Sequence, residues 1–139
     1  MPHNPSRLKV LERAFALAVD VHKLADRHQA EIARVSPGLR SQLLRAVDSI
    51  ALNITEAAGH TSPTRTSAQL MVAIASANEV ERQRRLGRAL DVIAADYDTL
   101  VDEVIEIRKM CFGLRRHLQQ NRAGESSRQI RDGERSIEK

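Results

Sequence analysis

Apolar residues in this sequence recur three or four positions apart, and this spacing favours packed α-helices. The longest such run contains Leu100, Val104, Ile107, Cys111, Leu114 and Leu118. A second run contains Leu43, Val47, Ile50, Ile54 and Ala57. Side chains at these spacings share one face of an α-helix. Only two Phe and one Tyr are present, and no Trp, so the core must be aliphatic, which suits helix packing.

The spacing and the cap signals predict one all-α domain over residues 7–120. The predicted helices span 7–28, 37–58, 63–89 and 96–120. Ser36-Pro37 and Ser62-Pro63 each place a capping residue before a proline at the first helical position, and Gly59 can end the second helix. Short connections between four helices predict an antiparallel up-down four-helix bundle. A right-angled array is the less favoured alternative.

Three segments outside these helices are polar. Residues 29–36 are predicted to connect the first two helices. Residues 1–6 hold two prolines and are expected to fray. Residues 121–139 are charged and lack sustained periodicity, so we predict a disordered tail there.

A polar stripe runs beside the apolar face of the second helix. Arg45, Ser49, Asn53 and Glu56 recur at steps of four, four and three. Ser and Asn are weak helix formers, but their hydroxyl and amide groups suit fixed hydrogen bonds in a packed interface. We expect these four residues and Glu79 to form a network within the bundle or between subunits. The alternative is a partly solvated helix flank.

The same stretch resembles a known protein family. Its matching residues are Gln42, Leu43, Arg45, Ala46, Ser49, Ile50, Asn53, Ile54, Glu56 and Gly59. They are similar to the signature helix of small four-helix-bundle proteins found in intervening sequences of 23S ribosomal RNA genes. Ala51, Ala57 and His60 depart from that signature. The segment from Ala75 to Glu81 is similar to a second family motif, and the likeness covers about residues 8–118.

This resemblance implies a bundle that assembles into a ring, commonly of five subunits, and implies little about activity. A more distant likeness is to the accessory variability protein of diversity-generating retroelements, a basic five-subunit barrel that binds nucleic acid and a reverse transcriptase. That likeness lies at the level of the fold. The implied partners are other copies of the chain, RNA or DNA, and a reverse transcriptase or another nucleic-acid enzyme.

Basic residues exceed acidic ones, with 22 Lys and Arg against 18 Asp and Glu and a formal net charge of +4. Arginine suits bidentate contacts to phosphate, although a GC-rich genome produces the same bias. In an up-down bundle, the start of the first and third helices and the end of the second and fourth share one pole. The basic residues predicted at this pole are Arg7, Lys9, Arg13, Arg65, Arg108, Lys109, Arg115 and Arg116.

A parallel ring would repeat this charge on one rim and attract polyanions through phosphate contacts and counterion release. With so few aromatic residues, base-specific recognition of single strands is not expected. The predicted function is therefore binding of the RNA or DNA backbone, and the alternative is a protein-interaction scaffold. At the opposite pole, the arginines of 82–88 are expected to pair with the acids of 91–103.

The sequence does not support an enzyme, a metal site or a cofactor site. Glu56 and His60 lie four apart, but a di-metal bundle needs a second such pair. Cys111, the single cysteine, lies within an apolar heptad, where a buried inert thiol is expected. One cysteine forms no internal disulfide, no apolar run approaches ~18 residues, and no signal-peptide pattern begins the chain. We therefore expect a cytoplasmic protein.

Overall fold

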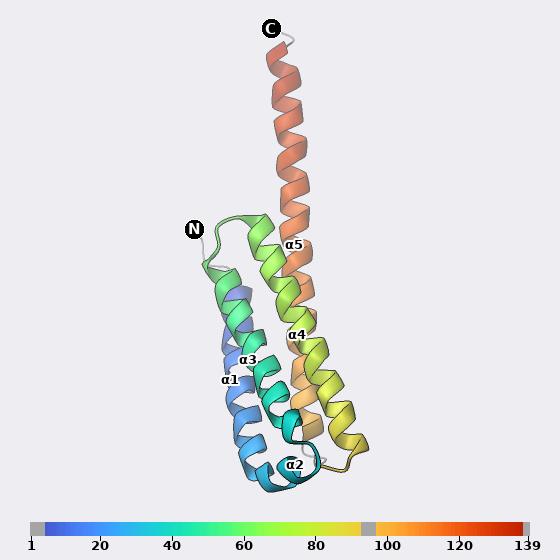
Figure 1. Ribbon diagram of the computed structural model, residues 1–139. Helices are drawn as coiled ribbons and strands as arrows, with labels where there is room; N and C mark the ends of the chain where they lie inside the picture. Colours follow the sequence, from blue (N-terminus) through green and yellow to red (C-terminus); the bar gives the residue numbers. More distant parts are fainter. Residues whose placement is uncertain (1–4, 93–96, 138–139) are drawn as a thin grey trace.

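The computed structural model describes residues 5–92 and 97–137, and within these ranges the protein is helical without any strand (Figure 1). The helices, in chain order, are α1 (Pro5–Arg27), α2 (Gln29–Val35), α3 (Pro37–Gly59), α4 (Pro63–Ala89) and α5 (Tyr97–Ile137). The all-α class predicted from the sequence is confirmed. Residues 1–4, position 96 and residues 138–139, which the predictions included, lie outside the described residues. Pro5 and Ser6, which were expected to fray, begin α1.

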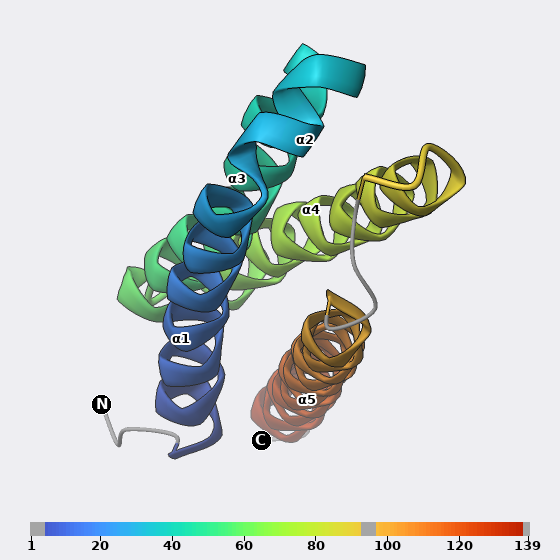
Figure 2. The same ribbon diagram turned by 90° about the horizontal axis from the view of Figure 1, so that it is seen from below.

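The four long helices form a closed cycle of contacts. α1 packs against α3 and α5, and α4 packs against the same two helices. Figure 1 shows that successive long helices run in opposite directions along the molecule. Figure 2 shows the short helix α2 at one end of the α1–α3 pair, and α2 contacts α3. This path brings the start of α1, the end of α3 and the start of α4 to one end of the molecule.

The core is aliphatic except for Tyr97, in agreement with the scarcity of aromatic residues in the sequence. On α5, Val104, Ile107 and Cys111 are at most 1% exposed. On α3, the whole predicted apolar face from Leu43 to Ala57 is buried. Burial raises the pKa of the Cys111 thiol to about 12, so the reactive thiolate is scarce at neutral pH. Tyr97, 1% exposed, is the largest of the fully buried side chains.

The two cap signals behave differently. Ser62 caps α4, because its hydroxyl accepts a hydrogen bond from the Arg65 backbone N–H at 3.4 Å. Ser36 makes no side-chain cap bond. Its backbone N–H instead donates to the Ile32 carbonyl at 2.8 Å and so closes the end of α2. Pro37 still begins α3 at the predicted residue.

Residues 29–36 were predicted to be a polar connection, and this prediction is wrong, because most of the segment forms the short helix α2. Ile32 anchors this helix and is only 2% exposed. A single buried residue produces no apolar periodicity, so the sequence pattern did not reveal the helix.

The prediction of a disordered tail over 121–139 also differs from the structure, which is helical there as far as Ile137. α5 continues through this segment to Ile137, and Figure 1 shows this part projecting beyond the other helices. The described side chains of 119–137 are all exposed, and we call this segment the arm. The packed part of α5 supplies the costly helical nucleus, so each further residue adds a hydrogen bond to an existing helix. Oppositely charged pairs three apart, such as Arg131 and Glu134, favour the extension.

Candidate nucleic-acid interface

Three of the eight predicted basic residues make ion pairs. Arg13 on α1 donates to both carboxylate oxygens of Glu103 on α5, at 2.7 and 2.8 Å. This bidentate pair raises the pKa of Arg13 further and ties the two helices together. Lys109 lies 3.4 Å from Glu106 on its own helix.

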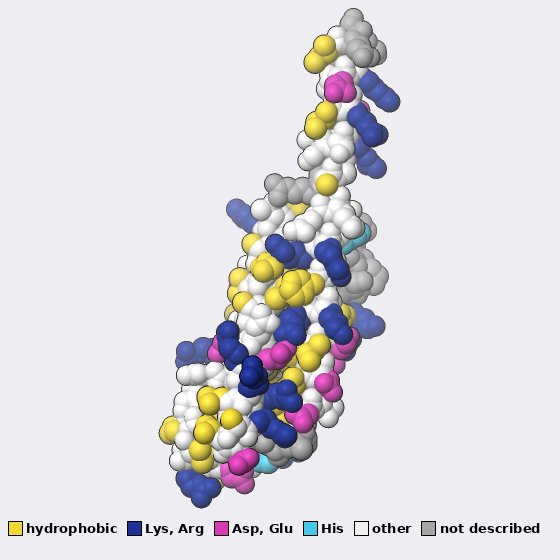
Figure 3. All heavy atoms as spheres, turned by 90° about the vertical axis from the view of Figure 1, so that its right-hand side faces the viewer, with side chains coloured by type: hydrophobic (Ala, Val, Ile, Leu, Met, Phe, Trp, Pro, Cys, Tyr) yellow, Lys and Arg dark blue, Asp and Glu magenta, His cyan; other side chains and the backbone are white. Residues whose placement is uncertain are grey.

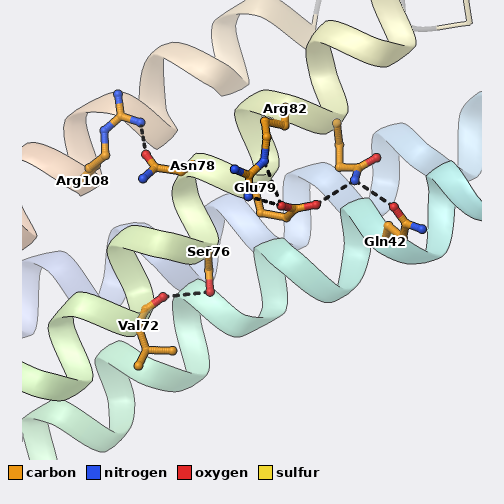
Figure 4. Close-up of polar contacts among 8 residues, drawn as sticks. Gln42, Val72, Ser76, Asn78, Glu79, Arg82 and Arg108 are labelled. Atoms are coloured by element: carbon orange, nitrogen blue, oxygen red, sulfur yellow. Dashed lines mark hydrogen bonds and ion pairs between the residues drawn. The ribbon is translucent and has the colours of Figure 1, made fainter.

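Arg108 links α5 to α4. Its guanidinium pairs with Glu81 and donates to the Asn78 side-chain oxygen at 2.7 Å, a contact drawn in Figure 4. The sequence pattern placed Glu103 at the opposite pole from Arg13, Arg108 and Lys109. It therefore predicted few acidic residues close enough to pair with these three cations. That placement differs from the structure because 103–109 lie midway along the packed part of α5, not at its end.

Five predicted residues have no carboxylate partner within the part of the chain that the structure describes. This basic cluster consists of Arg7, Lys9, Arg65, Arg115 and Arg116. Lys9, Arg65 and Arg116 are exposed, and the other two are half-buried. The cluster therefore carries charge that no acid in the described chain offsets.

The half-buried members of the basic cluster converge on the start of α4. Arg7 lines a small cavity together with Thr66 and Leu114. Arg115 lines an open cleft of about 270 Å³ beside the first turn of α4, and its Nε donates to the Ser67 hydroxyl at 3.0 Å. The first turn of α4 contains no acidic residue. The arrangement suits an anion, because these cations lie beside the start of α4, where the helix dipole is positive.

Figure 3 shows how charge is distributed on the side of the molecule that carries α4 and α5. Several Lys and Arg side chains lie on the part of the body near the base of the arm, among uncharged and hydrophobic surface, with few acids between them. Asp and Glu gather toward the far end of the body, interspersed with basic side chains. At that end, Arg84 donates to Asp98 at 2.8 Å and Arg88 lies 3.8 Å from it, so the predicted pairing holds for these two arginines.

The predicted polar network is divided into two clusters at the α3–α4 interface. In the first, the Ser49 and Ser76 hydroxyls lie 2.7 Å apart, and the Asn53 amide donates to the Ser49 carbonyl at 2.7 Å. The Gln69 amide donates to the Asn53 side-chain oxygen at 2.6 Å and also to Glu56. The sequence pattern did not identify Ser76 and Gln69, which lie on α4 and complete the cluster from across the helix interface.

The second cluster contains Glu79 (Figure 4). Gln83 donates to the Gln42 side-chain oxygen at 2.9 Å and to Glu79 at 2.8 Å. Glu79 also accepts hydrogen bonds from Arg82, and these bonds are the main cause of its lowered pKa. Arg45 is exposed and belongs to neither cluster. The contacts of both clusters lie within one chain.

Within residues 5–92 and 97–137, no group of three or more His, Cys, Asp or Glu is arranged to hold a metal ion. In the same ranges, no helix is both long and apolar enough to cross a membrane.

The sequence model of one family, the 23S rRNA-intervening sequence proteins, matches residues 6–113. This chain belongs to that family. The match includes the signature stretch of α3 and most of the packed part of α5, and it ends before the arm. The resemblance to this family noted from the sequence is thereby confirmed.

A solved structure with the same fold comes from a family with a related description. It is the 1.70 Å crystal structure of a protein of unknown function from the S23 ribosomal protein family of Bacteroides thetaiotaomicron VPI-5482. The TM-score is 0.68 and the sequence identity is 23%, over 80% of this chain and 98% of that chain. At this identity the likeness concerns the fold alone. Curated proteins gave no match.

Asn53 gives this family member a testable polar contact. We expect Asn53→Leu to keep the helical content, to lower the free energy of unfolding by about 1–3 kcal/mol and to alter assembly, because Ser49 and Gln69 lose a nearly buried partner. Circular dichroism during denaturation and light scattering measure these effects. Thr55→Leu is the control, since the Thr55 hydroxyl bonds only to its own helix. An unchanged oligomer would remove the support for a role in assembly.

Proposed function

We propose that this protein binds the phosphate backbone of RNA or DNA through the basic cluster and does not act as an enzyme. One observation carries the proposal: five basic side chains near the start of α4 lack carboxylate partners in the described chain, while neighbouring cations are paired. Charge that no acid offsets is available to an external polyanion.

The cleft beside Arg115 supports phosphate as the recognised group. Arg115 keeps guanidinium N–H groups beyond the Nε that bonds Ser67, and the first turn of α4 lies at the same cleft. A guanidinium presents planar, paired donors that match phosphate oxygens. The positive end of a helix dipole favours the same anion.

One aromatic side chain lies next to the cluster. Phe112 is 41% exposed and precedes Arg115 and Arg116 by three and four residues, which places all three on neighbouring positions of α5. Tyr97, in contrast, is buried. A single stacking side chain beside the basic cluster supports backbone binding with weak sequence preference.

The proposal extends to assembly and partners. We propose that the up-down helices associate into a ring, with five subunits being the number that the resemblance implies. A ring of parallel subunits would repeat the basic cluster on one rim and strengthen binding by multivalency. We also propose a cytoplasmic accessory role beside a larger nucleic-acid enzyme such as a reverse transcriptase, which rests on the sequence resemblance alone.

Fluorescence anisotropy of labelled short RNA and DNA across a salt series tests the function. We expect binding whose logarithm falls linearly with the logarithm of salt concentration, with a slope of roughly −0.7 to −0.9 per phosphate contacted. Poly-glutamate of similar length is the control for binding to an acidic protein. A scaffold that docks an acidic protein partner would bind poly-glutamate as well as, or better than, nucleic acid. Absence of nucleic-acid binding even at low salt would refute the proposal.

A further inference from the structure

The arm carries an unpartnered apolar stripe. Ala123, Ile130 and Ile137 are seven residues apart, so they lie on one side of the helix, and the two isoleucines are 63% and 85% exposed. The family match ends at residue 113, before the arm begins. The arm therefore lies outside the residues that the family model matches, and it exposes two large apolar side chains.

A second unpartnered stripe lies on α1. Leu8 and Phe15 are also seven residues apart and are 57% and 66% exposed, and Val19 follows at 37%. At ~1.5 Å rise per residue, the Leu8–Phe15 and Ile130–Ile137 separations are both about 10.5 Å along their helices. The two stripes therefore match in spacing.

The charges beside the two stripes are complementary in one direction. On α1, Lys9 and Glu12 flank the stripe, and both are exposed. On the arm, Arg131 and Glu134 occupy the equivalent flank. In an antiparallel pair, Ile137 lies against Leu8 and Ile130 lies against Phe15. The charged flank of α1 then lies next to the charged flank of the arm. Lys9 then lies beside Glu134, and Glu12 lies beside Arg131. A parallel alignment makes neither pair.

The arm cannot reach α1 of its own chain. The Arg13–Glu103 pair fixes α1 and α5 in an antiparallel register, in which the arm extends past the start of α1. Figure 1 shows the arm leaving the body beyond that end. Only a second molecule can bring α1 alongside the arm.

We propose that the arm of one molecule docks antiparallel along α1 of a second copy, with Ile130 and Ile137 packed on Phe15 and Leu8. This contact buries both exposed stripes at once. Antiparallel pairing of two arms makes similar charge pairs, but it overlaps only about two helical turns and leaves the α1 stripe exposed. Because the two surfaces differ, the contact is head-to-tail, and a dimer joined by it keeps one free arm and one free α1 stripe. The inference does not depend on nucleic-acid binding.

Disulfide trapping between single-site cysteine variants tests the register. Leu8→Cys and Ile137→Cys chains are mixed under mild oxidation, with the native Cys111 left in place because it is buried. We expect the disulfide-linked heterodimer, in which one chain carries Leu8→Cys and the other Ile137→Cys, to dominate. A mixture of Ile130→Cys and Ile137→Cys chains should give little product, and dominant linkage there would overturn the assignment in favour of arm–arm pairing.

Sedimentation velocity over a concentration series tests the energetics. We expect Ile130→Asp to weaken self-association more than tenfold without loss of helical content, since Ile130 is exposed in the single chain. Arg131→Glu should weaken association severalfold, and Glu12→Lys combined with Arg131→Glu should restore it. Asp132→Lys is the control, because Asp132 lies away from the stripe. Association unaffected by Ile130→Asp, or no rescue by the double reversal, would refute the proposal.

Discussion

Replacing Arg115 and Arg116 with glutamate is expected to weaken RNA binding at low salt by roughly tenfold or more, and to reduce the salt slope by about two. Both residues belong to the basic cluster, and neither pairs with a carboxylate in the described chain. The reversal removes two attractive charges and adds two repulsive ones beside the cleft. Anisotropy with the same labelled RNA across a salt series measures both quantities.

The matched control reverses Arg34 and Arg85, which are exposed on α2 and near the end of α4. This variant undergoes the same change in net charge at the opposite end of the body. We expect it to lose much less affinity than the cluster variant. Equal losses would mean that binding follows net charge alone, and unchanged binding by the cluster variant would mean that the assigned residues do not contact phosphate.

Replacing Leu43 with alanine is expected to lower the free energy of unfolding by about 2–5 kcal/mol. Leu43 is 2% exposed and lies on the apolar face of α3. It also lines a small cavity with Leu24, Ile32 and Tyr97, where α1, α2 and α5 meet α3. Truncation of Leu43 enlarges a cavity between four helices. Because these helices pack against one another, they can move little to fill the added space. Urea denaturation followed by circular dichroism measures the loss.

Leu52→Ala is the matched control on the same helix. Leu52 is 59% exposed, so its truncation removes little buried apolar surface and is expected to cost less than about 1 kcal/mol. Both measurements should be made at one protein concentration, because self-association contributes to apparent stability. Equal losses for the two variants would contradict the assignment of Leu43 to the core.

The sequence was most informative where two local signals agreed. For α4, apolar spacing followed a Ser-Pro start, and the predicted bounds of 63–89 match the structure. For α3, the heptad, Pro37 and Gly59 placed both ends to within one residue. The α5 heptad identified the buried face of that helix, including Cys111, because burial in a helix pair follows directly from the spacing.

Other features depend on distances that spacing cannot provide. Helix α2 depends on one side chain, Ile32, which packs into a cavity formed by three other helices. The arm depends on the packed helix that precedes it. For the candidate interface, the sequence pattern named eight basic residues and did not distinguish the five of the basic cluster from Arg13, Arg108 and Lys109. Arg13 and Arg108 find acids on other helices, so only the register between α1, α4 and α5 distinguishes them from the cluster.

The burial of Tyr97 has a spectroscopic consequence. The sequence has one Tyr and no Trp, so a single phenol accounts for nearly all ultraviolet absorption and intrinsic fluorescence of the side chains. Burial raises the pKa of this phenol well above its usual range, so alkaline titration should produce the phenolate band only as the protein unfolds. The native chain thus contains its own optical reporter of global unfolding, at the start of α5, and needs no added fluorophore.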